Sequence, residues 1–136
     1  MEIMVNYWAV LAASVAGMVL GCLWYGPVFG KQWQKLMGFT SKSMKNMALT
    51  PAAAMTLGFI TSLVMNYVIS IFVDYTASAT FGNGAKLGFL LWLGIAMPLT
   101  SGVFLWEGKQ LRLFFLNTAY WLVALALSSG IIAAMG

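Results

Sequence analysis

The stretch IMVNYWAVLAASVAGMVLGCLWYGPVFG, residues 3–30, contains no Asp, Glu, Lys or Arg. It exceeds the roughly 20 apolar residues that a helix needs to cross the hydrocarbon core of a bilayer. Three further uncharged runs, residues 46–73, 87–106 and 113–136, also reach that length. The apolar positions are continuous within each run and do not alternate with polar ones, which excludes a strand barrel. The sequence therefore predicts four membrane-spanning helices.

The composition of the 136-residue chain agrees with this interpretation. Hydrophobic residues make up 62% of the chain and charged residues 7%, whereas soluble domains carry roughly 25% charged residues. A chain this short could bury only part of so much apolar surface in one core. The chain has no histidine and a single cysteine, Cys22, so its side chains offer no zinc or haem site. We expect no cofactor, no metal and no nucleic-acid partner.

The predicted fold is all-α, with a single transmembrane domain over residues 1–136. It is an integral membrane four-helix bundle with spans at about residues 3–27, 50–73, 86–105 and 112–134. Thr50 and Pro51 provide a cap and a first helical residue for span two,. The uncharged run 75–85, which contains Asn83-Gly84, is too short to span and is expected to form a loop.

The basic residues indicate the orientation of the chain. Six of the seven lie in two loops. They are Lys31, Lys35, Lys42 and Lys45 between spans one and two, and Lys109 and Arg112 between spans three and four. Lys86 lies on the other side, with Glu2 and Asp74. The positive-inside rule then places both loops in the cytoplasm and both termini outside a bacterial plasma membrane. No cleavage site precedes a turn near the N-terminus, so we expect span one to be retained.

Residues 28–38 are expected to form an amphipathic helix at the membrane interface between spans one and two. Phe29, Trp33 and Leu36 recur at helical spacing, while Lys31 and Lys35 lie on the other face. Such a helix buries its rings at the acyl boundary and extends its lysines to anionic head groups. It is either a membrane anchor or part of an anionic lipid or ligand site. The candidate contacts of that site are Lys31, Trp33, Lys35, Lys109 and Arg112.

Small residues line one side of span one. Ala9, Ala13, Gly17 and Gly21 recur at four-residue intervals, which allows a second helix to approach closely. The stripe serves packing within one chain or contact between copies of the chain, because small residues suit both.

Polar residues within the spans fall into separate layers. A helix rises 1.5 Å per residue, which gives the depth of each residue from the cytoplasmic end of its span. Asn66 and Ser128 are expected in a layer near the outer side of the membrane, and Asn117 and Pro98 in a layer near the cytoplasmic side, so Asn66 and Asn117 cannot meet. Pro98 frees the carbonyl group of Gly94 from its helical hydrogen bond. The hydroxyls of Thr100 or Ser101, or a neighbouring helix, are expected to satisfy such groups, and Asn117 is a further candidate.

The sequence offers little chemistry within the hydrocarbon region. No acid, base or histidine lies there to relay protons, and no pair of titratable groups reaches one substrate. We expect a non-enzymatic, homo-oligomeric membrane protein with a structural, partner-binding or lipid-binding role. The alternative is a small transporter or channel for an unidentified solute. A membrane enzyme acting on lipids through Asp74 or Glu107 is the third possibility.

Three motifs resemble those of a known family. They are LWYGPVFGK at residues 23–31, WLG at residues 92–94 with Pro98, and WEGK at residues 106–109 leading into LNTAYW at residues 116–121. In this order, and over essentially the whole chain, they resemble a family of small bacterial membrane proteins catalogued as domain of unknown function 1761. The chain departs from that pattern at Ser128-Ser129-Gly130, where a bulkier residue is expected before the glycine.

The resemblance implies a four-helix, multi-pass membrane protein without an established activity, and it transfers no catalytic residue. The candidate structural residues of the motifs gather at the cytoplasmic ends of the spans. They are Trp24, Tyr25, Gly26, Pro27, Pro98, Glu107 and Asn117. We further hypothesise that Glu107 pairs with Lys31, Lys35 or Arg112 and holds the second basic loop against the interfacial helix.

Overall fold

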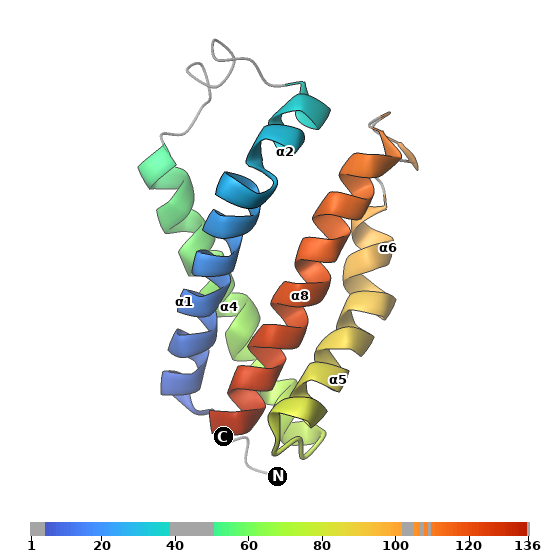
Figure 1. Cartoon of the computed structure of the whole chain (residues 1–136). Coiled ribbons are helices and arrows are strands. Elements are labelled where there is room, and N and C mark those ends of the chain that lie inside the picture. The colour runs from blue at the N-terminus through green and yellow to red at the C-terminus, as the bar shows by residue number, and fades with distance from the viewer. Residues whose placement is uncertain (1–4, 39–50, 102–104, 107, 109, 136) are drawn as a thin grey trace.

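The fold was analysed in a computed structural model that describes residues 5–38, 51–101, 105, 106, 108 and 110–135. Within these ranges the regular structure is entirely helical, with no strand, which confirms the all-α prediction (Figure 1). Three helices are long and apolar enough to cross a membrane. They are Tyr7–Val28, Ala52–Tyr75 and Leu111–Met135.

Within the described residues the helical elements fall into four groups, here called rods, whose members follow one another along the chain directly or after one residue. The first rod holds α1 (Tyr7–Leu23), a π-helical turn η1 (Trp24–Val28) and α2 (Gly30–Met37). The second is α4 (Pro51–Tyr75). The third joins α5 (Phe81–Leu91), a π-helical turn η2 (Trp92–Ala96) and α6 (Met97–Thr100), and the fourth is α8 (Leu111–Met135).

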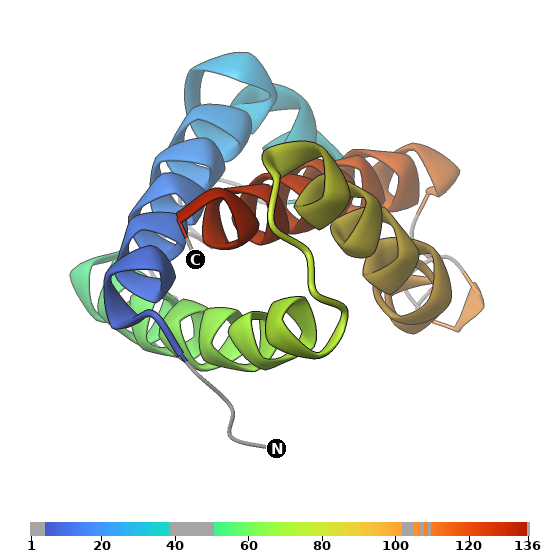
Figure 2. The same ribbon diagram turned by 90° about the horizontal axis from the view of Figure 1, so that it is seen from below.

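Helix α8 is the centre of the arrangement. It contacts α1, α4, α5, α6 and η2, and it lies between α1 and the α5–α6 rod in both views (Figures 1 and 2). One end of the molecule, here called the terminal end, carries the start of α1 and the end of α8; the opposite end, which carries α2, is called the α2 end (Figure 1). Asn6 links the start of α1 to the end of α8. Its Nδ2 donates to the carbonyl of Met135 at 3.0 Å, and its Oδ1 caps α1.

The first rod bends where the sequence has Gly26 and Pro27. Gly26 has a non-helical backbone, φ −109° and ψ −106°, and Pro27 follows it inside η1. The N–H group of Phe29 donates to the carbonyl of Trp24 at 2.8 Å, and α2 then begins. Gly38 ends α2 in the left-handed conformation, φ 75°, which glycine adopts without strain. Helix α2 therefore falls within the predicted range 28–38.

Helix α5 begins earlier than the sequence predicted. The run 75–85 was expected to be a loop, but α5 begins at Phe81, so only the segment between Tyr75 and Phe81 connects two helices. Thr80 explains the difference, because its Oγ1 accepts the N–H group of Asn83 at 3.2 Å and caps the helix. The Asn83-Gly84 pair thus lies in the first turn of a helix. The predicted span 86–105 falls on α5, η2 and α6, and its residues 102–104 lie outside the described ranges.

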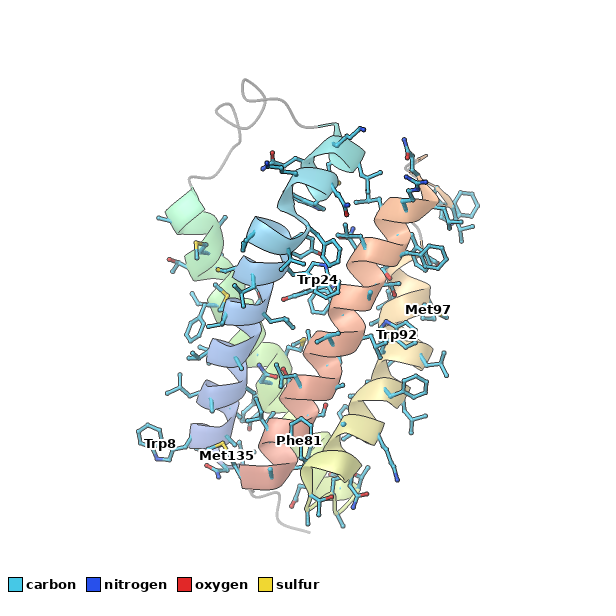
Figure 3. All side chains as sticks on the ribbon, in the orientation of Figure 1. Trp8, Trp24, Phe81, Trp92, Met97 and Met135 are labelled. Carbon is cyan, nitrogen blue, oxygen red and sulfur yellow. The ribbon has the colours of Figure 1, made fainter. Side chains whose placement is uncertain are left out.

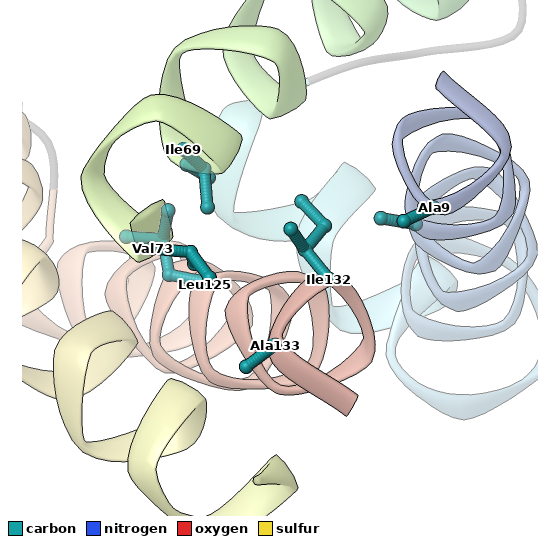
Figure 4. Close-up of a cluster of buried hydrophobic side chains, with 7 residues drawn as sticks. Ala9, Ile69, Val73, Leu125, Ile132 and Ala133 are labelled. Carbon is teal, nitrogen blue, oxygen red and sulfur yellow. The ribbon is translucent and has the colours of Figure 1, made fainter. Parts of the chain in front are cut away.

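Seven buried apolar side chains form one core cluster, which is drawn in Figure 4. The core cluster comprises Ala9, Ala13, Ile69, Val73, Leu125, Ile132 and Ala133. Large apolar side chains face outward along the helices, as Trp8 does in Figure 3 with 75% of its surface exposed and Leu99 with 77%. A protein that exposes so much apolar surface along its helices is suited to a lipid environment.

Candidate functional site

The candidate site is a cavity of about 820 Å³ between the η1–α2 segment and the start of α8, here called the α2–α8 cavity. Its lining includes ten of the described residues: Trp24, Phe29, Gln32, Lys35, Leu36, Gln110, Arg112, Phe115, Leu116 and Ala119. Two of the predicted anionic-contact residues, Lys35 and Arg112, are among them. The structure thus brings together two basic residues that are 77 positions apart in the sequence.

The polar part of the cavity lining, here called the polar wall, consists of hydrogen-bonding groups and positive charges. Lys35 and Arg112 contribute the charges, and the two glutamines contribute amides. The indole Nε1 of Trp24, another lining residue, is buried and donates to no acceptor in the described part of the chain. An indole N–H group can only donate, and leaving it unpaired away from water is unfavourable. None of the described lining residues carries a carboxylate, so this wall is suited to an anion.

The remaining lining residues are apolar and are here called the apolar wall. Phe29 and Leu36 contribute to it from the η1–α2 side, and Phe115, Leu116 and Ala119 from α8. A cavity with a cationic wall and an apolar wall matches an amphipathic molecule better than a free ion.

Aromatic side chains fix the geometry of this region. The ring centroid of Trp24 lies 4.8 Å from that of Phe29 and 6.1 Å from that of Tyr120. Tyr25 packs against Trp33 at 5.4 Å and against Tyr120 at 5.2 Å. Because Tyr120 belongs to α8, these contacts hold η1 and α2 against that helix.

Asn117 contacts η1. Its Oδ1 accepts the hydroxyl of Tyr25 at 2.8 Å, so it links α8 to η1. The hypothesis that Asn117 serves a carbonyl near Pro98 stays a prediction, because that contact would use its Nδ2. The hydroxyls of Thr100 and Ser101 donate to the carbonyls of Ala96 and Pro98, at 2.8 Å and 2.6 Å, and these two bonds do not involve the carbonyl of Gly94.

The third rod is tied to α8 at η2. The indole Nε1 of Trp92 donates to the carbonyl of Thr118 at 2.7 Å and to its Oγ1 at 3.1 Å. Both ends of this contact come from the sequence motifs, WLG and LNTAYW. These motif residues thus join helices to one another.

The other predicted contact residues have different positions. Lys31 is exposed on α2 and is not part of the cavity lining. Trp33 packs on Tyr25. Lys42, Lys45, Glu107 and Lys109 lie outside the described residues, so the hypothesised ion pair of Glu107 stays a prediction.

The small-residue stripe of α1 faces the interior of the chain. Ala9 and Ala13 are completely buried. A Cβ atom added to Gly17 would lie 3.8 Å from Ser62 Oγ, and one added to Gly21 would lie 3.2 Å from Tyr120 Oη. The stripe is thus in contact with α4 and α8 of the same chain.

The closest helix contact is one that the sequence interpretation missed. A Cβ atom added to Gly84 would collide with the carbonyl oxygen of Ser129, and one added to Gly88 with the carbonyl oxygen of Leu125. Helix α5 therefore lies directly on the backbone of α8. The available signal was the Gly-x-x-x-Gly spacing of residues 84 and 88, which was lost when the first glycine was assigned to a loop.

These features define a class of protein: an all-helical chain with helices suited to a membrane and an amphipathic, cation-lined cavity at one end. Among the described residues, no group of three His, Cys, Asp or Glu side chains could hold a metal ion. A family model described as "Protein of unknown function (DUF1761)" matches residues 8–133, and the chain belongs to that family. This confirms the resemblance noted in the sequence. No curated protein and no solved structure matches the chain.

Proposed function

We propose that this chain is a four-span, non-enzymatic membrane protein that binds the head group of an anionic lipid in the α2–α8 cavity. The observation that carries the proposal is that Lys35, Arg112 and Trp24, whose buried Nε1 lacks an acceptor, line one cavity together with apolar side chains. A phosphate group accepts hydrogen bonds from guanidinium, ammonium and indole donors, and those from charged donors are the stronger ones. The apolar wall would contact the first part of the acyl chains.

The four spans and their orientation are part of the proposal. The α5–α6 rod runs beside α8 (Figure 1). Its range Phe81–Thr100 reaches the roughly 20 residues that a crossing needs, which supports a fourth crossing. Both ends of the described chain lie at the terminal end, in agreement with an even number of crossings. Lys31, Lys35 and Arg112 lie at the α2 end, and the positive-inside rule then assigns that end to the cytoplasm of a bacterial cell. Helix α2 would lie in the interface of the inner leaflet.

Association of several copies also stays a proposal. The stripe Ala9, Ala13, Gly17 and Gly21 is in contact with helices of its own chain. A contact between copies would therefore use the lipid-facing side chains of other surfaces.

The lipid site predicts a specific effect of removing its charges. We expect the double variant Lys35→Gln and Arg112→Gln to bind phosphatidylglycerol about 30-fold more weakly, because each basic residue near the membrane surface contributes about 1 kcal/mol. Native mass spectrometry with titrated lipid measures this affinity. Binding of zwitterionic phosphatidylcholine should change little.

The matched control is Lys31→Gln, which removes an exposed lysine of the same helix outside the cavity. We expect it to retain most of the affinity. Inorganic phosphate in excess should not displace the lipid, because it makes no contact with the apolar wall. Equal losses in the control and the double variant would indicate general attraction to a basic surface and would contradict the site.

A further inference from the structure

A second cavity lies at the terminal end, which is the end that Figure 2 views, and has a volume of about 480 Å³. The end of α4, the connection that follows it, the residues before α1 and the end of α8 contribute to its lining. The described lining residues are Val5, Asn6, Ser70, Val73, Asp74, Ala77, Ser78, Ala79 and Ile132. We call this space the Asp74 cavity. It is separate from the α2–α8 cavity and does not depend on the lipid site.

The carboxylate of Asp74 has no counter-charge in the part of the chain that the structure describes. Asp74 is half-buried and is the only acidic residue within the described ranges. It makes no ion pair and its side chain accepts no hydrogen bond from a described residue. No lysine or arginine is among the described lining residues. Lys86, the basic residue of the same end, lines a neighbouring cavity.

The position of Asp74 at a helix end is electrostatically unfavourable. Helix α4 ends at Tyr75, so Asp74 lies in its last turn. The carbonyl groups at the C-terminal end of a helix carry a partial negative charge, which repels a carboxylate and attracts a cation. Ile132, from the last turn of α8, also lines the cavity. A charge that is placed against the local electrostatics and lies in a cavity is typical of a functional site.

Two hydroxyl groups accompany the carboxylate. Ser70 precedes Asp74 by four residues and therefore lies on the same face of α4. It is 4% exposed and makes no hydrogen bond with a described residue. Ser78 Oγ lies 2.8 Å from Thr76 Oγ1. Because Thr76 directs its hydrogen to carbonyl groups of α4, Ser78 is the donor of this pair, and its oxygen can accept a further hydrogen bond.

We propose that the Asp74 cavity binds an organic molecule through its primary ammonium group. Such a group has three N–H donors, and Asp74, Ser70 and Ser78 offer three acceptors around one space. Hydrogen bonds between a carboxylate and an ammonium group are of the strong, charge-assisted kind. The hydrocarbon part of the ligand would contact the apolar members of the lining, which are Val5, Val73, Ala77, Ala79 and Ile132.

A metal ion suits this cavity less well than an organic cation. Among the described residues, no three His, Cys, Asp or Glu side chains come together to hold one. Calcium and magnesium sites surround the ion with six or more oxygen ligands at short distance, whereas more than half of the described lining residues here are apolar.

NMR of the full chain in phosphatidylcholine nanodiscs tests the proposal. Asp74 is the only aspartate of the chain, so selective ¹³C labelling of the aspartate carboxyl group gives one signal. Titration with benzylammonium chloride at neutral pH should shift this signal until it saturates, and neutral benzyl alcohol should shift it little. Absence of a saturable shift, or equal shifts with both compounds, would overturn the proposal. Saturation by sodium or calcium chloride at lower concentrations would assign the site to a metal ion and would also contradict it.

The variant Asp74→Asn should change ligand binding and stability in opposite directions. We expect benzylammonium to bind at least about tenfold more weakly, measured by calorimetry, because the charged hydrogen bond is lost. Without ligand, the unfolding midpoint should equal or exceed that of the wild type, because the variant removes the repulsion at the end of α4.

Lys86→Gln is the matched control, because it removes a charge of the same end outside the Asp74 cavity. It should retain the affinity of the wild type. Equal losses in the two variants, or unchanged binding in Asp74→Asn, would contradict the site. Lost binding together with a lower midpoint of Asp74→Asn would indicate a structural role of Asp74. If that variant does not fold, the labelled wild-type chain decides alone.

Discussion

Alanine at both Gly84 and Gly88 is expected to separate α5 from α8 and to lower the free energy of unfolding by about 4 kcal/mol. Each new methyl group would collide with a carbonyl oxygen of α8, that of Ser129 or that of Leu125. Backbone atoms cannot move aside as a flexible side chain does, and one overpacked site typically costs about 1–3 kcal/mol. The midpoint of unfolding in mixed detergent micelles measures the loss.

Gly82→Ala is the matched control for this pair. Gly82 lies in the same helix, and a Cβ atom there meets nothing within 4 Å. Because alanine favours a helix more than glycine does, by about 1 kcal/mol, this variant should be as stable as the wild type or slightly more stable. A double variant as stable as the Gly82 control would mean that α5 does not rest on the α8 backbone.

Leucine at Ala13 is expected to destabilise the single chain by about 3 kcal/mol. Ala13 is completely buried in the cluster with Ile69, Leu125 and Ile132, where three additional carbon atoms have no space. Ala54→Leu, at an exposed position of α4, is the control and should change stability by no more than about 0.5 kcal/mol.

This variant also distinguishes the two roles of the small-residue stripe. If the stripe packs within the chain, Ala13→Leu lowers the unfolding midpoint at every protein concentration. If it joined two copies, the variant would dissociate an oligomer while the separated chain kept its unfolding midpoint. Size-exclusion chromatography with light scattering, combined with unfolding curves, separates these outcomes, and the second one would contradict the packing described for α1.

Local signals in the sequence predicted much of the fold. Long uncharged runs place apolar side chains on every face of a helix, and a helix of this kind needs lipid or protein around it regardless of tertiary detail. The boundary between the predicted span 3–27 and the interfacial segment 28–38 also depends on local signals. The backbone preferences of Gly26 and Pro27 bend the chain there,. The start of α4 at Pro51 was predicted from a local signal as well, because proline is favoured at the first position of a helix.

The start of α5 could not be read from local preference alone. Asn83-Gly84 favours a turn, but the Thr80 cap and the contact of Gly84 with α8 favour a helix. The two contacts of α5 with α8 join residues 45 and 37 positions apart in the sequence, Gly84 with Ser129 and Gly88 with Leu125, and no periodicity within either segment reveals the pairing.

The candidate site was predicted in part. The charge pattern identified Lys35 and Arg112, since basic loops at one side of a membrane attract anionic lipids. The role of Trp24 was missed, because an unpaired N–H group becomes visible only when η1 packs against α8 and excludes other acceptors. The pairing of Tyr25 with Asn117 was also missed, because it depends on the same packing.

The lipid site follows from the way the start of α8 packs against the η1–α2 segment. If the chain crosses a bilayer as proposed, the α2–α8 cavity lies at the depth of the inner head groups. A different orientation would move the basic residues to the opposite leaflet and remove the basis of the lipid proposal.

Labelling of single cysteines in spheroplasts tests this central claim most directly. In a chain carrying Cys22→Ala, the variants Lys31→Cys and Trp106→Cys represent the α2 end, and Ser78→Cys and Met135→Cys the terminal end. A membrane-impermeant maleimide should label Ser78→Cys and Met135→Cys in intact spheroplasts, and Lys31→Cys and Trp106→Cys only after the membrane is permeabilised. Labelling of Lys31→Cys from outside, or labelling of all four positions from the same side, would contradict the account.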